Sequence, residues 1–230
     1  MARSLRTIFT RILRHNSPTL RSRGSVVRRF AEKVGLVYFG SVDQYDDEHE
    51  IIRGLTASTT HQDSHYAVGA YDGYDISMVD RFDVIVDPQG HATEHMWLII
   101  RINLETQQTL PHFFLAPVGH SPHAYNKFYN AYTHLKAINT QFSSDHSHEF
   151  HARYQLHAAS AHIQAIESLF TPSVTHTIAA RFWPHAIEFF DGSLYLYTTD
   201  TKLTSTLLES SLESAVWLAR AIDQAEDEES

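Results

Sequence analysis

The chain has 230 residues, enough for one sizeable hydrophobic core or for two small ones. A hydrophobic content of 43% and an aromatic content of 12% are typical of a folded globular protein and exclude a disordered one. Cysteine is absent, which excludes disulfide bonds, thiolate metal sites and a cysteine nucleophile. No apolar run approaches the roughly 18 residues of a transmembrane helix, so we expect no membrane span.

The net charge of −9 is divided unevenly along the chain. Residues 1–31 contain eight arginines and no acidic residue, which leaves ten basic residues against 27 acidic ones for the rest, a net charge of −17. This asymmetry favours a basic arm that meets an anionic partner or serves as a targeting signal. Nucleic acid is a poor candidate for that partner, because phosphates would repel the acidic body.

The arm has the residue spacing of a short amphipathic helix. On a helical wheel, one sector collects the apolar side chains of Leu5, Ile8, Phe9, Ile12 and Leu13. The basic side chains outside this sector are Arg3, Arg6, Arg11 and Arg14. Pro18 is expected to end the helix, because a proline disfavours helical geometry in the residue before it. Residues 19–25 are then predicted to form a flexible basic linker.

Three interpretations of the arm remain open. It can lie in the interface of an anionic membrane, with the apolar side chains in the acyl boundary and the arginines facing the headgroups. It also fits the description of a cleavable mitochondrial transit peptide, which is amphipathic, rich in arginine and free of acidic residues. Finally, the arm can dock on the acidic body of its own chain. We take the membrane surface as the first expectation.

The first half of the body reads as two short helices followed by strands. Residues 26–35 are expected to form a helix closed by Gly35, and a second short helix is expected near residues 51–55. Asp72-Gly73 predicts a hairpin between strands 66–71 and 74–86. The strand 74–86 alternates apolar and polar residues, apart from Asp80, which falls on the apolar face. Two further strands are expected at 94–104 and 112–116.

The second half reads as helices around a strand and a second hairpin. Ser121-Pro122 predicts the start of a tyrosine-rich helix that continues to about residue 135. A strand is expected at 149–157, because Phe150, Ala152, Tyr154 and Leu156 alternate. The remaining expected elements are helices at 159–169 and 172–182, strands 186–190 and 193–198 joined by Asp191-Gly192, and a helix at 203–224.

Consecutive strands joined by hairpins predict an α+β fold with a largely antiparallel sheet packed with helices. We divide the chain into an arm and linker at 1–25, a body at 26–224 and an acidic tail at 225–230. A subdomain boundary within the body is considered near residues 118–148.

The 17 histidines raise the question of a metal site. The tightest group is His146, His148 and His151, whose neutral imidazoles could bind zinc or nickel. Alternation along the expected strand would point His148 and His151 to opposite faces, which weakens this alternative. The glycine-rich phosphate loops and the GxSxG nucleophile motif are absent from the sequence. We therefore predict no cofactor and no catalytic residue.

Several short motifs resemble a poorly characterised group of bacterial proteins of unknown function. They are Phe30-Ala31-x-x-x-Gly35, Gly69-Ala70-Tyr71-Asp72-Gly73-Tyr74, Leu110-Pro111-x-Phe113, Ser147-x-Glu149-Phe150-x-x-Arg153-Tyr154 and Leu169-Phe170-Thr171-Pro172. The resemblance runs from about residue 26 to 222. Similar proteins often carry membrane-associated N-terminal segments, and the resemblance implies no activity and no functional residues.

The sequence thus favours a non-enzymatic peripheral membrane or interaction protein. We expect it in the cytoplasm, at the inner face of the membrane, with the arm as its contact to anionic lipid. Two alternatives are kept: a metal-dependent enzyme that uses the histidines near residues 146–151, and an organellar protein whose arm is removed.

Overall fold

The computed structural model describes residues 18–41, 61–86, 89–106, 109–120, 132–138, 148–199 and 202–227. The arm at residues 3–14, the short helix expected near 51–55 and most of the helix expected after Ser121 lie outside these ranges.

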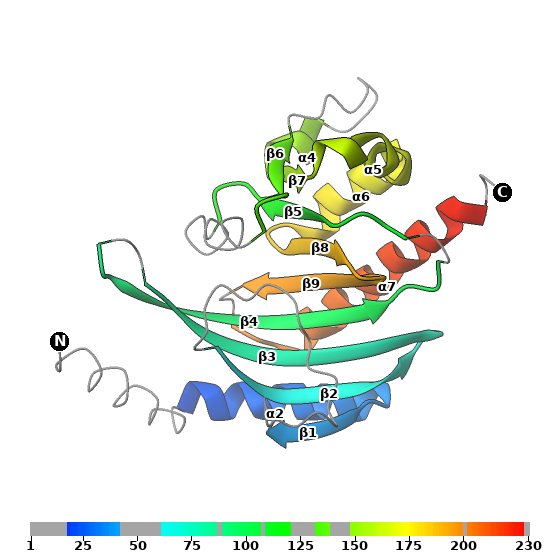
Figure 1. Cartoon of the computed structure of the whole chain (residues 1–230). Helices are drawn as coiled ribbons and strands as arrows, with labels where there is room; N and C mark the ends of the chain where they lie inside the picture. Colours follow the sequence, from blue (N-terminus) through cyan, green and yellow to red (C-terminus); the bar gives the residue numbers. More distant parts are fainter. Residues whose placement is uncertain are drawn as a thin grey trace.

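A nine-stranded antiparallel sheet forms the centre of the molecule (Figure 1). Its strand order is β1-β2-β3-β4-β9-β8-β5-β7-β6. The strands are β1 (Val37–Ser41), β2 (Gln62–Tyr71), β3 (Tyr74–Val86), β4 (Ala92–Asn103), β5 (Phe113–Pro117), β6 (Lys136–Ile138), β7 (Tyr154–Ala158), β8 (Ala186–Phe190) and β9 (Ser193–Thr199). With the helices described below, this arrangement confirms the predicted α+β class.

Both predicted hairpins are confirmed. Asp72 and Gly73 have φ angles of 53° and 92°, and Asp191 and Gly192 have φ angles of 51° and 67°. Two consecutive residues with positive φ form the turn whose twist matches that of the flanking strands. The first turn joins β2 to β3 and the second joins β8 to β9.

The helices pack on one face of the sheet and bury the larger hydrophobic cluster there. They are α2 (Pro18–Val34), α4 (His148–Arg153), α5 (Ile163–Leu169), α6 (Pro172–Phe182) and α7 (Ser205–Asp227), with a 3₁₀ turn, η2 (Ser160–His162), before α5. A row of cross-strand partners runs along this face through Met78, Ile100, Leu196, Ile187, Leu115 and Leu156. The row crosses six strands, so this part of the sheet is continuous from β3 to β7.

The opposite face carries a second buried cluster, which includes Val79, Trp97, Ile99, Phe114 and Tyr197. These side chains alternate with the first set along each strand, as expected for a strand that is buried on both sides. The hydrogen-bonded chain that ends at Tyr197, analysed below, also lies on this face, whereas the ion pair between Arg23 and Asp80 lies on the face that the helices cover.

Two of the predicted elements are wrong. The segment predicted as a flexible linker belongs to α2, which begins at Pro18; proline is favoured at the first helical position because the N–H that it lacks would have no partner there. The strand predicted at 149–157 is the helix α4 followed by the short strand β7. Phe150 and Tyr154 are stacked with ring centroids 5.8 Å apart, because a spacing of four residues brings side chains to one side in a helix as well as in a strand.

Candidate functional site at the N-terminal helix

Helix α2 is the element that connects the basic arm to the body. Its buried face carries Val27, Phe30 and Ala31, whose spacing of three and four residues is that of an amphipathic helix. Gly35, with φ at 83°, ends the helix, and the Leu36 N–H donates to the Ala31 carbonyl at 2.9 Å. This bond is the 6→1 contact of a Schellman cap. The helix packs against β1, β2 and α7, so it is an integral part of the body.

A buried ion pair fixes the first turns of α2 to the sheet. The Arg23 guanidinium donates from Nε to Asp80 Oδ2 at 2.9 Å and from NH2 to Asp80 Oδ1 at 2.6 Å. Arg23 is 7% exposed and Asp80 is 2% exposed. Removing one partner of such a pair leaves an uncompensated buried charge, which costs about 3–5 kcal/mol. The contact therefore determines where the N-terminal end of α2 lies on the sheet.

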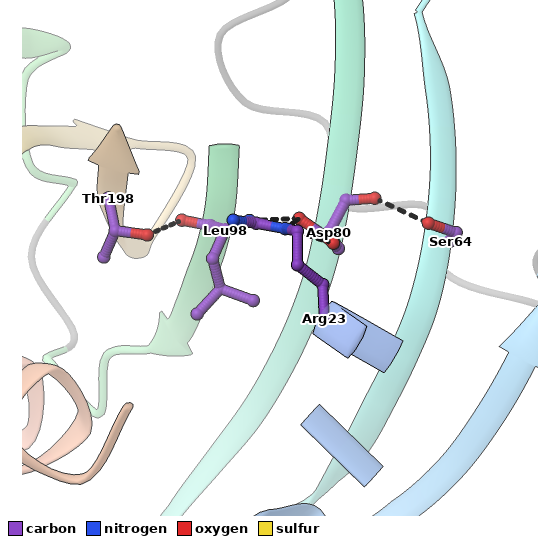
Figure 2. A network of polar contacts seen from close by, with 5 residues as sticks. All are labelled: Arg23, Ser64, Asp80, Leu98 and Thr198. Atoms are coloured by element: carbon purple, nitrogen blue, oxygen red, sulfur yellow. Dashed lines mark hydrogen bonds and ion pairs between the residues drawn. The ribbon is translucent and has the colours of Figure 1, made fainter. Parts of the chain in front are cut away.

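Figure 2 shows how the strands on either side hold the backbone around this pair. The Ser64 hydroxyl on β2 donates to the Asp80 carbonyl at 3.2 Å. Leu98 on β4 is the direct cross-strand partner of Asp80, and the Thr198 hydroxyl on β9 donates to the Leu98 carbonyl at 3.1 Å. The carboxylate that receives Arg23 is thus held by bonds that extend over four strands.

A close contact between Gly24 and His65 also fixes α2 on the sheet. We refer to this contact and the ion pair between Arg23 and Asp80 together as the seat of α2. A methyl group at Gly24 would lie 2.3 Å from Cε1 of His65, so this approach needs a glycine. His65 has a φ angle of 56° and lies at an irregularity in the pairing of β2 with β3. Its Nδ1 is 2.9 Å from the hydroxyl of Tyr38 on β1, and the two rings are stacked. The helix therefore rests on an imidazole that two neighbouring strands hold in place.

Tyr38 stays neutral in this environment. Burial raises the pKa of its hydroxyl above the ordinary value of 10, the nearby charge of Arg28 opposes that shift, and Asp80 adds to it. The neutral hydroxyl remains a proton donor or acceptor for His65 at physiological pH. The ion pair between Arg23 and Asp80 consequently remains the main charged contact of the seat.

The exposed side of α2 makes weaker contacts. Arg28 pairs with Glu32 at 2.9 Å, and Lys33 reaches Glu209 on α7 at 2.7 Å. All four side chains are largely exposed, and such pairs contribute at most about 1 kcal/mol each. Among the arginines counted in the basic segment, Arg23 is thus a structural residue and Arg28 a surface residue.

The residues predicted to contact a membrane all precede Pro18, so they lie outside the described residues. They are Arg3, Leu5, Arg6, Ile8, Phe9, Arg11, Ile12, Leu13 and Arg14. The prediction missed Arg23, which it placed in a linker. One signal was available, because Asp80 is the charged exception on the apolar face of its strand and needs a buried partner.

The predicted histidine group is not brought together by the described residues. His146 lies outside them, whereas His148 and His151 are exposed on α4, three residues apart. Within the described ranges, the structure contains no group of three or more His, Asp or Glu side chains that could hold a metal ion. The metal hypothesis therefore receives no support from this part of the chain.

A bilayer-spanning helix was not expected from the sequence. None of the helices in the described ranges is long and apolar enough to cross a membrane.

Comparison with known proteins gives one distant structural likeness. No protein-family model matches the chain, and no curated protein matches it. The fold is similar to that in the crystal structure of the mycobacterial trehalose monomycolate transport factor A, TtfA, with a TM-score of 0.53 and 10% sequence identity. The alignment covers 89% of this chain and 94% of that one. At this identity, the comparison shows that the two chains share a fold.

Proposed function

We propose that the protein is a non-enzymatic interaction protein that its basic arm holds at an anionic membrane surface. The main support is the seat of α2, because the arm joins the body directly at a helix that is fixed by Arg23 and Asp80. A body attached in this way would face the membrane with a defined side.

The distance between the arm and the body is short. His15, Asn16 and Ser17 separate Arg14 from Pro18, and four residue steps span at most about 14 Å. An arm bound at the membrane would therefore keep the start of α2 within about that distance of the interface. This closeness supports a protein that works beside the bilayer, and not one that extends far from it on a flexible tether.

The charge of the arm is sufficient for reversible binding. Each basic residue near an anionic surface contributes about 1 kcal/mol, so the four arginines at positions 3, 6, 11 and 14 would supply about 4 kcal/mol. The apolar face adds its own contribution on insertion. The acidic body would be repelled by the same surface, which favours contact through the arm alone.

The structural likeness bears on the interaction role that we propose for the body. The similar chain is described as a transport factor for trehalose monomycolate. A transport factor can act by contact with partner proteins, and we propose an interaction role of that general kind for the acidic body.

Co-sedimentation with liposomes tests the proposal on the full chain. We expect pelleting with vesicles that contain phosphatidylglycerol, little pelleting with pure phosphatidylcholine, and release in high salt, because screening weakens charge attraction. Replacing Arg3, Arg6, Arg11 and Arg14 by glutamine should abolish the pelleting. Equal pelleting of this variant would contradict the proposal.

Two controls separate the arm from the rest of the protein. Replacing Arg28 and Arg29, which are exposed on α2, by glutamine removes charge from the same region and should leave most of the binding intact. Determining the N-terminal sequence of the native protein tests the targeting alternative. If the first residues have been removed, the arm is a cleaved signal and the membrane role is wrong.

A further inference from the structure

Four side chains form a continuous hydrogen-bonded chain on the sheet face opposite the helices. The Tyr197 hydroxyl on β9 donates to Glu188 Oε2 on β8. Glu188 Oε1 lies 2.8 Å from Nε2 of His112, which directly precedes β5. His112 Nδ1 lies 2.9 Å from Nε2 of His134, two residues before β6. We refer to these four residues as the relay.

The relay leads from the interior of the protein to the solvent. Tyr197 is fully buried and Glu188 is 1% exposed, whereas His134 is an exposed residue. The ring of His112 lies between these ends, with ring centroids 5.1 Å from Tyr132 and 4.6 Å from Phe190. These aromatic contacts hold the imidazole in the plane that its two hydrogen bonds require.

The acceptor at Glu188 determines where the protons lie on both histidines. A carboxylate only accepts, so Nε2 of His112 carries a proton and donates it. The Nδ1 atom of a neutral His112 is then an acceptor, and the facing Nε2 of His134 must be the donor. The two ring centroids are 5.0 Å apart, a separation that fits rings joined almost in line through this bond. The contact thus has room for one proton between its two nitrogens.

We propose that the contact between His112 and His134 is a pH-sensitive switch that holds residues 132–138 on the sheet while at least one of the two imidazoles is neutral. One added proton leaves the contact intact, because Glu188 balances the charge through His112. A second proton places two N–H groups face to face at a distance of 2.9 Å and two positive charges beside each other. The bond is then lost, and the pair becomes repulsive.

The switch would act on the edge of the sheet. Residues 132–138 contain Leu135, which is 2% exposed, and the edge strand β6, which pairs with β7 through three residue pairs. A strand this short contributes little pairing energy of its own, so loss of the histidine contact weakens a substantial part of its attachment. Release would leave the outer edge of β7 open for another strand.

The charges around His112 and His134 favour release of residues 132–138 from the sheet in acid. The titratable groups on the surrounding elements are Glu188 on β8, Tyr195 and Tyr197 on β9, Tyr154 and His157 on β7, Lys136 on β6 and His162 on η2, together with Tyr132, whose ring centroid lies 5.9 Å from that of His134. Although His134 is largely exposed, partial desolvation of its ring lowers its pKa, and the positive charges of His112 and His162 lower it further. Burial raises the pKa of Tyr195, so that residue remains neutral and supplies no counter-charge. The second proton would therefore bind below the ordinary histidine pKa of about 6.5.

Hydrogen exchange of the full chain, read by mass spectrometry at pH 7.5 and 5.0 with correction for intrinsic exchange, tests the switch. In the wild type, we expect protection of residues 132–138 to fall about tenfold in acid while peptides of β3 and β4 stay protected. His134→Gln keeps an N–H donor for His112 but cannot be protonated, so its protection should change less than about twofold. His176→Gln, at an exposed position on α6, is the matched control and should behave as the wild type.

A second variant gives the direction of the effect. Glu188→Gln removes the charge that balances the first proton, so release should require more acid than in the wild type. The proposal is overturned if His134→Gln loses protection to the same extent as the wild type, which would point to His157 instead. Loss of protection in β3 and β4 together with residues 132–138 would also overturn it, because the cause would then be global unfolding.

Nitrogen NMR of the wild type avoids any dependence on the folding of the variants. At pH 7.5, His112 and His134 should both carry their proton on Nε2. A proton on Nδ1 of His112 would contradict the order of the relay and with it the switch.

Discussion

Asp80 and Arg81 are neighbours in β3 with opposite charges, yet they form ion pairs on opposite faces of the sheet. Asp80 receives Arg23 from the helix side, whereas Arg81 donates to both carboxylate oxygens of Asp63 at 2.7 Å on the other side. Successive side chains of a strand point in opposite directions, which prevents the two neighbours from pairing with each other. The side chains of Arg81 and Asp63 are each 1% exposed, so the middle of β3 holds two buried ion pairs in consecutive positions.

Loss of Arg23 should destabilise the protein strongly. Arg23→Met leaves the Asp80 carboxylate buried without its cation, and we expect the free energy of unfolding to fall by about 3–5 kcal/mol in urea denaturation. The double variant Arg23→Met with Asp80→Leu should recover most of this loss, because no buried charge remains. Arg28→Met, whose partner Glu32 is exposed, serves as the control and should change stability by less than about 1 kcal/mol.

Gly24→Ala should destabilise the protein although alanine is the better helix former. Alanine gains about 1 kcal/mol in helix propensity, but overpacking against the ring of His65 costs about 1–3 kcal/mol. The sign should reverse when the ring is absent, so that Gly24→Ala stabilises a His65→Ala background. A double-mutant cycle in urea measures this coupling. Equal effects in the two backgrounds would show that the helix does not rest on His65.

Stability should fall as the pH is lowered from 6.5 to 4. Burial lowers the pKa values of His157 and His185 to about 4. Between pH 6.5 and pH 4, these two histidines bind protons in the unfolded chain but stay neutral in the folded chain, so acid favours unfolding. The loss is at most about 3 kcal/mol for the buried His185 and smaller for the partly buried His157, because solvent screens its charge.

Urea denaturation at pH 7.5 and 4.5 measures this effect. His185→Phe keeps an aromatic ring of similar shape without a titrating group, and its loss of stability in acid should be smaller than that of the wild type. An unchanged pH dependence in this variant would remove His185 from the explanation.

Tyr74→Phe should loosen the C-terminal part of α7. The Tyr74 hydroxyl donates to Asp223 Oδ2 at 2.8 Å, and the backbone N–H of Thr106 donates to Asp223 Oδ1 at 3.0 Å. Burial, followed by the bond to Asp223, raises the pKa of Tyr74, so the hydroxyl is a donor at all ordinary pH values. We expect a loss of about 1–2 kcal/mol and faster hydrogen exchange around residue 223. Tyr71→Phe, in the preceding strand, is the control.

The hairpins and several helices could be predicted from the sequence because their signals are local. The two Asp-Gly turns and the Thr171-Pro172 helix start combine backbone preferences within a few residues. The seat of α2 could not be predicted, because it depends on a residue 57 positions away in the chain. Asp80 indicated that a buried cation was needed, but local spacing does not identify which of the arginines supplies it.

The relay escaped sequence analysis for the same reason. His112 and His134 were two among 17 histidines, and the attention given to His146, His148 and His151 rested on their closeness in the chain. The strand order brings β5 beside β8, which places His112 next to Glu188, 76 positions later. Clustering along the sequence was therefore a poor guide to clustering in space.

The position of the last hairpin has a consequence for synthesis of the protein. β4 pairs with β9, and β5 lies between β8 and β7, so the centre of the sheet is completed by residues 186–199. Until the ribosome has added that hairpin, β4 lacks its partner β9 and β5 lacks its partner β8. A nascent chain that ends before residue 186 would expose the edge of β4 and the apolar rows beside it. Such chains are candidates for aggregation and for binding by chaperones.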